Sequence, residues 1–321
     1  MFTNRARVCL AVAATFAVLF ATSPAAFADR SCTAAERTAA DRQLWLNDAD
    51  HARSIDDNLL WGEPVLTGDD TQNEFVLTQR NYVIGYDGDL RIPTWTAHRI
   101  RASGLGRVER INCFRRDARL DRPFASYTTD YEEPLFDQGH LTPNGDMSFG
   151  KYAVENSFIM SNMAPQYCQF NRGVWQILET LGRFWAHRDG ELYVIAGSIV
   201  DRDGSPGRDG DDDAWRMHSN NGDENVAIPS AFFKILARPS ENGRFEALTL
   251  ILPHDRTDLD GQAAIDYLNQ HVRSIAEVEA LTGLDIVDEN SVDEADAIWS
   301  TQGASFSSLV YAPCRAVTDM R

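Results

Sequence analysis

The chain contains 321 residues, 43% of them hydrophobic, and carries a formal net charge of −18. This length is sufficient for one large domain or two small ones. The acidity favours solubility and argues against non-specific adhesion to nucleic acid, although a local basic cleft would still allow a nucleic-acid substrate.

Residues 1–28 have the pattern of a secretory signal peptide. Arg5 and Arg7 precede an apolar run over residues 8–20, and Ala26-Phe27-Ala28 supplies small residues at a cleavage site. The run is too short for a typical membrane span, and no later stretch reaches the ~18 apolar residues that a span needs. The sequence therefore predicts a secreted protein, extracellular or periplasmic, with no membrane segment after cleavage. An uncleaved N-terminal anchor is the alternative.

The first half of the chain divides into a polar segment and the start of a core. Residues 29–74 form an N-terminal extension in which we expect a helix over 39–60. The core is predicted to begin at residue 75, with strands over 81–86 and 95–100 on either side of a turn. A charged loop over residues 107–122 follows.

The second half alternates between predicted strands and helices. We expect strands over 157–160, 191–200, 226–237 and 245–252, helices over 171–188 and 258–282, an acidic loop over 201–213 and a stop at Gly283. This order predicts an α+β fold with one core and a mixed or antiparallel sheet.

Four cysteines would remain after removal of the signal peptide, which contains Cys9. They are Cys32, Cys113, Cys168 and Cys314. An even set in an exported chain predicts two disulfides, with free buried thiols as the alternative, and leaves all three pairings open.

Three polar segments stand out by the chemistry of their residues. They are residues 137–143, residues 161–166 and the predicted helix from Asn171. At about 100° per residue, Glu179 lies near 80° and Arg183 near 120° from Asn171, so the three share one face, while apolar residues occupy the other.

This set of residue types suits phosphodiester hydrolysis. A histidine such as His140 can take a proton from water, a metal ion can neutralise phosphate charge, and an arginine can hold a non-bridging oxygen. Each residue alone also has a structural interpretation. Asn171 could be a helix N-cap, Glu179 and Arg183 a surface pair, and His140 a surface residue.

The combined pattern resembles a known family. Asp137-Gln138-Gly139-His140 is similar to the Asp-Arg-Gly-His signature of the DNA/RNA non-specific endonucleases, which belong to the ββα-metal or His-Me finger nucleases. Residues 161–166 resemble the family's Ser-Asn-x-x-Pro-Gln stretch, and Asn171 with Trp175, Glu179 and Arg183 has its metal-helix spacing. The resemblance covers roughly residues 75 to 290, which implies a nuclease domain there and a C-terminal tail over 291–321.

The resemblance implies a role for each of six residues. His140 would be the general base, Asn171 the direct ligand of a single Mg²⁺, for which Mn²⁺ could substitute, and Glu179 a ligand through water. Arg183 and, by a looser match, Arg91 would stabilise the transition state, and Asn162 would support the site. DNA and RNA would be cut to 5′-phosphate products.

One departure and one further feature leave alternatives open. Gln138 stands where the family usually has arginine, so a catalytically weakened nucleic-acid-binding protein is an alternative. A nuclease effector used against other bacteria, with the same chemistry, is a separate alternative. The 201–213 loop could bind Ca²⁺ but does not fit the EF-hand pattern. The sequence leaves open the oligomeric state and the preference between DNA and RNA.

Overall fold

The computed structural model describes most of the chain. The described residues are 30–67, 73–200, 215–218, 224–240, 243–288, 291–304 and 314. The predicted signal peptide and the acidic loop over 201–213 lie outside these ranges.

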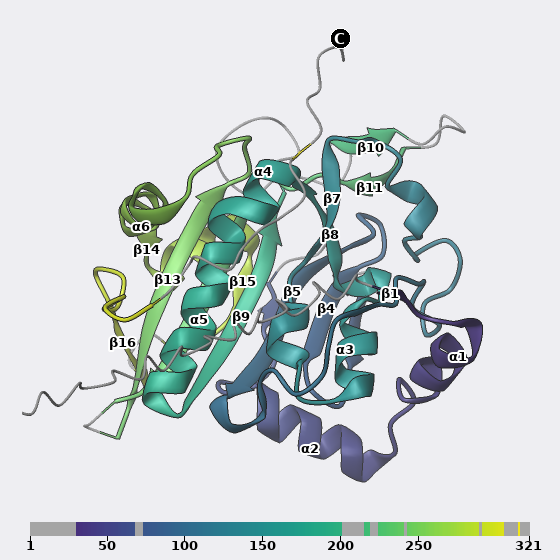
Figure 1. Cartoon of the computed structure of the whole chain (residues 1–321), viewed down its shortest axis with the longest axis horizontal. Helices are drawn as coiled ribbons and strands as arrows, with labels where there is room; N and C mark the ends of the chain where they lie inside the picture. The colour runs from purple at the N-terminus through teal and green to yellow at the C-terminus, as the bar shows by residue number, and fades with distance from the viewer. Residues whose placement is uncertain are drawn as a thin grey trace, which may run out of the picture.

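An antiparallel sheet forms the centre of the fold (Figure 1). Its strands, in spatial order, are β14 (Val272–Arg273), β13 (Phe245–Pro253), β12 (Ala231–Pro239), β9 (Glu191–Ile199), β5 (Ile92–Arg101), β4 (Val83–Asp87) and β3 (Glu74–Thr78). A further strand, β16 (Val292–Glu294), pairs in parallel with β13. The prediction of an α+β fold with a mixed sheet is confirmed.

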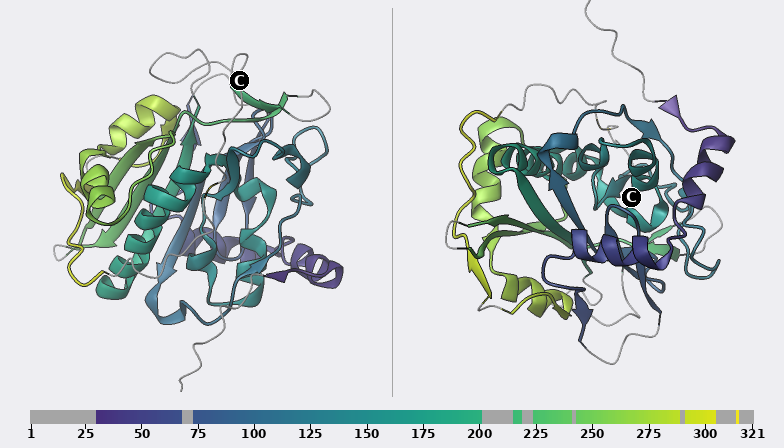
Figure 2. Two further views of the ribbon diagram at one scale, coloured as in Figure 1. Left: turned by 45° about the horizontal axis from the view of Figure 1, so that its top comes forward. Right: turned by 90° about the horizontal axis from the view of Figure 1, so that it is seen from below.

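Helices cover both faces of this sheet because its central strands are apolar on both sides. In β9, Val194 packs into one hydrophobic cluster and Ile195 into another. The first cluster includes the apolar face of α5 (Gln176–Asp189), and the second includes α7 (Ile275–Thr282). Figure 2 shows the sheet between these two layers.

The predicted helix over 39–60 is two helices, α1 (Ala34–Arg42) and α2 (Asp48–Asn58). The break has a local cause. The side chain of Asn47 accepts a hydrogen bond from the backbone of Asp50 at 2.9 Å, so Asn47 caps a new helix rather than continuing the first.

Three other predicted elements also differ from the structure. Residues 157–160 are the end of α3 (Lys151–Ser157) and the start of the turn η4 (Met160–Asn162), not a strand. The strand over 226–237 is interrupted near Pro229, giving β11 (Glu224–Ala227) and β12. The helix over 258–282 is α6 (Gly261–Gln270) and α7, because Ser274 caps a new helix. Gly283 ends α7 with a φ of 70°, as predicted.

Two disulfides are present, which confirms their number. They join Cys32 to Cys113 and Cys168 to Cys314. The first fastens the N-terminal segment beside the parallel pair β1 (Arg30–Ser31) and β6 (Ile111–Asn112). The second attaches residue 314 to the start of the helix that carries Asn171.

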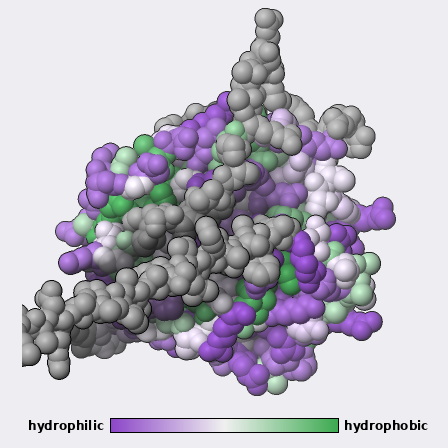
Figure 3. Space-filling model, in the orientation of Figure 1, coloured by the Kyte–Doolittle hydropathy of each residue, from purple (hydrophilic) through white to green (hydrophobic). Residues whose placement is uncertain are grey.

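The described surface is mainly hydrophilic on the face that Figure 3 shows. Large apolar side chains that are well exposed are Trp45, Val65, Val76, Phe149, Tyr152 and Trp215. Within the described ranges, no helix has the length and apolarity needed to cross a membrane.

A buried histidine, His254, links two distant segments of the chain. His254 donates from Nδ1 to the carbonyl of Pro229 at 2.7 Å and accepts at Nε2 from the backbone N–H of Tyr167 at 2.7 Å. Only the neutral ring can make both bonds. Burial lowers the pKa of His254 to about 4.

We expect the free energy of unfolding to fall as the pH drops from 6.5 towards 4. In the unfolded chain, His254 binds a proton with its ordinary pKa of about 6.5, whereas in the folded protein its pKa is about 4. Protonation therefore favours the unfolded state and lowers the free energy of unfolding by about 3 kcal/mol at pH 4. Urea unfolding of the natural protein and of His254→Gln at pH 7 and pH 4 would measure it. Equal losses in the two proteins would contradict the prediction.

Candidate active site

His140 is the last residue of a short strand outside the central sheet. Strand β7 (Phe136–His140) pairs antiparallel with β8 (Met163–Tyr167), and His140 lies opposite Met163. Gly139 lies within β7. A Cβ on Gly139 would stand 2.3 Å from Cδ of Gln166, so glycine is needed because the Gln166 side chain lies across the strand.

The imidazole of His140 lies among aromatic rings rather than in the solvent. Its ring centroid is 4.8 Å from that of Phe158, in an edge-on arrangement, and 5.9 Å from that of Phe114. Nε2 is buried and has no hydrogen-bond partner among the described residues. Burial, together with the nearby charge of Arg110, holds the pKa of His140 well below its ordinary value. The ring is therefore neutral, the state that a general base requires.

Asn162 supports the chain that follows His140. It is fully buried, and its side chain accepts from the backbone N–H of Thr142 at 2.9 Å and donates to the carbonyls of Thr142 and Ser157 at 2.9 and 2.8 Å. These bonds occupy the amide with backbone groups. Asn162 thus positions the 140–142 segment and does not face the site.

The helix that carries Asn171 is not regular from its start, which corrects the predicted continuous helix. A short turn, α4 (Cys168–Phe170), leads into a π-helical segment, η5 (Asn171–Trp175), and then into α5. Gly173 interrupts the helix with φ −104° and ψ −114°. Bulges of this kind are frequent at functional sites. Here Trp175 also donates from Nε1 to the carbonyl of His140 at 3.2 Å, which ties the helix to β7.

Asp137, the first residue of the motif, sets the orientation of Asn171. Its two carboxylate oxygens accept from Arg172 at 2.8 Å each, and Nδ2 of Asn171 donates to Oδ2 at 2.9 Å. A carboxylate only accepts, so the nitrogen of the Asn171 amide must face Asp137. Oδ1 of Asn171 is then the atom that can bind a cation.

Glu179 lies on α5 and is half-buried. Burial raises the pKa of its carboxyl to about 7, while the charges of Lys234 and Arg183 act in the opposite direction. Lys234 comes from β12, is buried, and places Nζ 3.9 Å from the ring centroid of Trp175. A carboxylate in this setting would gain from a divalent cation, which favours its ionised form. The amide oxygen of Asn171 and the carboxylate of Glu179 are both oxygen donors of the kind that a hard divalent cation prefers.

Arg183 is fixed by a buried pair that sequence analysis missed. Its Nη1 donates to Oδ1 of Asp146 at 2.8 Å, and Oδ2 of Asp146 lies 2.9 Å from Nε2 of His98. Burial acts to raise the pKa of Asp146, but His98 and Arg183 keep it below its ordinary value. Gly145 leaves room for the guanidinium, since a Cβ there would lie 2.8 Å from Nη1 of Arg183.

Two further arginines, Arg91 and Arg110, have charges that act on buried titratable groups. Arg91 lies in the turn between β4 and β5 with a φ of 57°, and its charge acts on Asp130 and Tyr86. Arg110, from the loop predicted over 107–122, instead has its charge near both His140 and Glu179, and its Cζ lies 4.9 Å from the ring centroid of Phe158. No pattern in the sequence singled it out.

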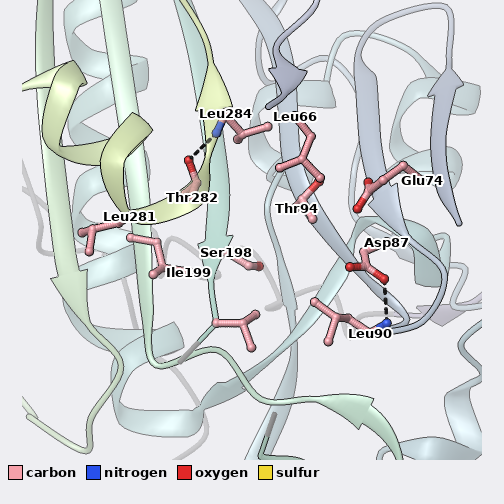
Figure 4. Close-up of a pocket in the computed structure, with 11 residues that line it drawn as sticks. Leu66, Glu74, Asp87, Leu90, Thr94, Ser198, Ile199, Leu281, Thr282 and Leu284 are labelled. Carbon is pink, nitrogen blue, oxygen red and sulfur yellow. Dashed lines mark hydrogen bonds between the residues drawn. The ribbon is translucent and has the colours of Figure 1, made fainter. Parts of the chain in front are cut away.

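A separate cavity of about 40 Å³ lies between the β3–β4 hairpin, β9 and the end of α7. Figure 4 shows the carboxylates of Glu74 and Asp87 on one side of it, with Asp87 accepting from the backbone of Leu90. Neither His140 nor any residue grouped with it above lines this cavity.

Asn171, Glu179 and Arg183 thus come from η5 and α5, which Trp175 ties to His140 of β7. The charge of Arg110 acts on both His140 and Glu179. Comparison with known proteins gives a consistent result. Residues 65–293 match the family model described as DNA/RNA non-specific endonuclease.

Curated relatives and a solved structure are also similar. Mitochondrial endonuclease G of Caenorhabditis elegans is 33% identical over 184 residues, which cover 56% of this chain and 58% of that protein. Nuclease C1 of Cunninghamella echinulata var. echinulata is 28% identical over 222 residues, covering 67% of this chain and 84% of that protein. The crystal structure of an EndoG/EndoGI complex superposes with a TM-score of 0.59 at 22% identity, covering 78% of this chain and 97% of that chain, and shows a shared fold.

Proposed function

Because the chain belongs to the DNA/RNA non-specific endonuclease family, we propose that it is a metal-dependent endonuclease that hydrolyses DNA and RNA to 5′-phosphate products. Its nuclease domain would be residues 75–290, with an N-terminal extension over 29–74 and a tail over 291–321. The observation that supports the proposal is the bond from Trp175 to the His140 carbonyl, which ties the strand carrying a neutral imidazole to the helical region that carries Asn171, Glu179 and Arg183.

His140 would act as the general base. Its neutral ring can accept a proton from the attacking water, and the carbonyl of the same residue is held by Trp175. The resulting imidazolium would be short-lived, because burial and Arg110 both favour the neutral form. Asn162 would keep the following backbone in place throughout the reaction.

Asn171, through Oδ1, and Glu179, through water, would hold Mg²⁺ or, as a substitute, Mn²⁺. When bound, this ion would neutralise negative charge on the phosphate and on the leaving oxygen. Arg183 would bind a non-bridging oxygen in the transition state, and Arg91 stays a weaker proposal for the same task. Gln138 lies opposite Pro165 in the hairpin and would contribute hydrogen bonds but no charge.

Secretion after removal of residues 1–28 is part of the proposal. Two disulfides support it, because such bonds form and persist in oxidising compartments.

The mature protein should degrade both plasmid DNA and RNA with Mg²⁺ and leave both intact with EDTA. Gel electrophoresis after a timed digestion measures this, and re-addition of Mg²⁺ after EDTA is the control for irreversible damage. Activity that persists in EDTA would contradict the metal dependence. Intact substrate with every divalent cation, together with binding, would favour a nucleic-acid-binding protein of the same fold.

A further inference from the structure

A fully buried histidine lies behind Arg183, and the proposed mechanism does not use it. His98 belongs to β5 and lies opposite Val194 of β9, so its side chain is on the face of the sheet that α5 covers (Figure 1). None of its surface is exposed. His98 therefore does not reach a substrate, and it can influence the reaction only through another side chain.

Asp146 is the side chain through which His98 can act. Nε2 of His98 lies 2.9 Å from Oδ2 of Asp146, and a carboxylate only accepts, so Nε2 carries the proton of this hydrogen bond. Nδ1 is buried and makes no hydrogen bond in the described part of the chain. Asp146 belongs to the turn η3 (Asn144–Met147), which begins four residues after His140. The hydrogen bond therefore joins the central sheet to the segment that follows His140.

The two oxygens of Asp146 have different partners. Oδ2 accepts from His98, and Oδ1 accepts from Nη1 of Arg183 at 2.8 Å. Asp146 is only 3% exposed, so bulk water has little access to either oxygen. If the donor on His98 were absent, Oδ2 would be a buried acceptor without a partner, which is costly. The carboxylate could recover a donor by rotating so that both of its oxygens bind Arg183.

Such a rotation would change the orientation of Arg183. Nη1 of Arg183 contacts one oxygen of Asp146, while Nη2 donates to Oγ1 of Thr180 at 3.1 Å. These two contacts set the plane of the guanidinium, and 23% of the side chain is exposed, so a phosphate can reach it. A contact to both oxygens would occupy more N–H donors and turn the group towards Asp146. Misplacement of a reacting group by about 1 Å can cost on the order of 10²-fold in rate.

We propose that His98 is a positioning residue for Arg183. By holding Oδ2 of Asp146, it leaves only Oδ1 to orient the guanidinium, and this keeps Arg183 in the orientation that binds a phosphate oxygen. The inference rests on the proposed nuclease function, in which Arg183 stabilises the transition state. It extends the site to the central sheet. It also places the effect on turnover rather than on substrate binding, because the arginine contact is strongest in the transition state.

Two substitutions of His98 separate its hydrogen bond from its volume. His98→Leu fills the space without a donor and should lower kcat by about 10- to 100-fold, with KM changed by less than about threefold. His98→Gln can place an amide N–H near the position of Nε2 and should restore most of the lost turnover. Initial rates on plasmid DNA at saturating Mg²⁺ measure both, and equal rates in the two variants would contradict the inference. His98→Met is a second variant without a donor, for use if thermal unfolding shows that His98→Leu does not fold.

A double-substitution cycle tests whether the effect passes through Arg183. His98→Leu should lower kcat by less than about twofold when Arg183 is already alanine. Comparable losses in both backgrounds would show a general effect on the fold and would overturn the inference. Thr96→Val is the matched control, because Thr96 lies on the same strand, is fully buried, and has no hydrogen-bond partner for Oγ1 among the described residues. It should leave kcat unchanged.

A measurement without turnover keeps the inference separate from the proposed function. In ¹H–¹⁵N NMR spectra, the Nε–H signal of Arg183 is identified by its loss in Arg183→Ala. It should shift in His98→Leu and stay near its natural position in His98→Gln and Thr96→Val. An unchanged signal in His98→Leu would count against the inference. Absence of nuclease activity with every divalent cation would instead count against the proposed function, and the NMR comparison would still decide whether His98 positions Arg183.

Discussion

Replacement of His140 by alanine is expected to lower kcat by about 10²–10⁴-fold while nucleic-acid binding persists. The imidazole is kept neutral by burial and by Arg110, and Nε2 has no partner among the described side chains. These properties suit a proton acceptor and serve no evident purpose in packing. Initial rates on plasmid DNA at saturating Mg²⁺, together with binding in EDTA, measure the two effects separately.

His187→Ala is the matched control because His187 is an exposed histidine near the end of α5. It should retain full turnover. Near-normal turnover in His140→Ala would contradict the role of His140 as general base. Loss of nucleic-acid binding in parallel with turnover would indicate a damaged fold. Thermal unfolding of both variants distinguishes these cases.

Replacement of Arg183 by alanine is expected to lower kcat by about 10²–10³-fold, since it removes a donor that would stabilise developing charge. A sharper test leaves the arginine in place. A methyl group at Gly145 would lie 2.8 Å from Nη1, so Gly145→Ala should displace the guanidinium and lower kcat by about 10- to 100-fold. The flexible end of Arg183 can move, so the fold should survive.

Gly150→Ala is the control for Gly145→Ala. Gly150 has no positive φ, and a Cβ there would meet its nearest neighbour at 3.9 Å. It should change kcat little. If Gly145→Ala retained full activity while Arg183→Ala did not, the position of the guanidinium seen here would not be the one used in catalysis.

Local patterns predicted the parts of the site that lie on one element. The face shared by Glu179 and Arg183 followed from the helical repeat, because apolar residues on the other side of α5 fill the core. The π-helical segment around Gly173 could not be predicted from that repeat. Its backbone is set by contacts with β7, through Asp137 and Trp175, that no local repeat encodes.

Residues that act through distant partners could not be predicted in the same way. His98 and Asp146 are 48 positions apart, and each is unremarkable among its neighbours in the sequence. Arg110 lies in a loop with many other charges, and its place beside Phe158 depends on how that loop crosses α3. Sequence analysis also joined α1 to α2 and β11 to β12, because the caps and breaks between them are single residues.

The bond between Cys168 and Cys314 constrains the order of events during biosynthesis. The two cysteines are 146 residues apart, and β9, β12 and β13 all lie between them in the chain. The three central strands must therefore be translated before the disulfide between Cys168 and Cys314 can form. Cys168 precedes Asn171 by three residues, so the turn that carries Asn171 receives its covalent anchor only after translation has passed residue 314 and the chain has met an oxidant. Inside a reducing cytosol, the newly made chain would lack that anchor.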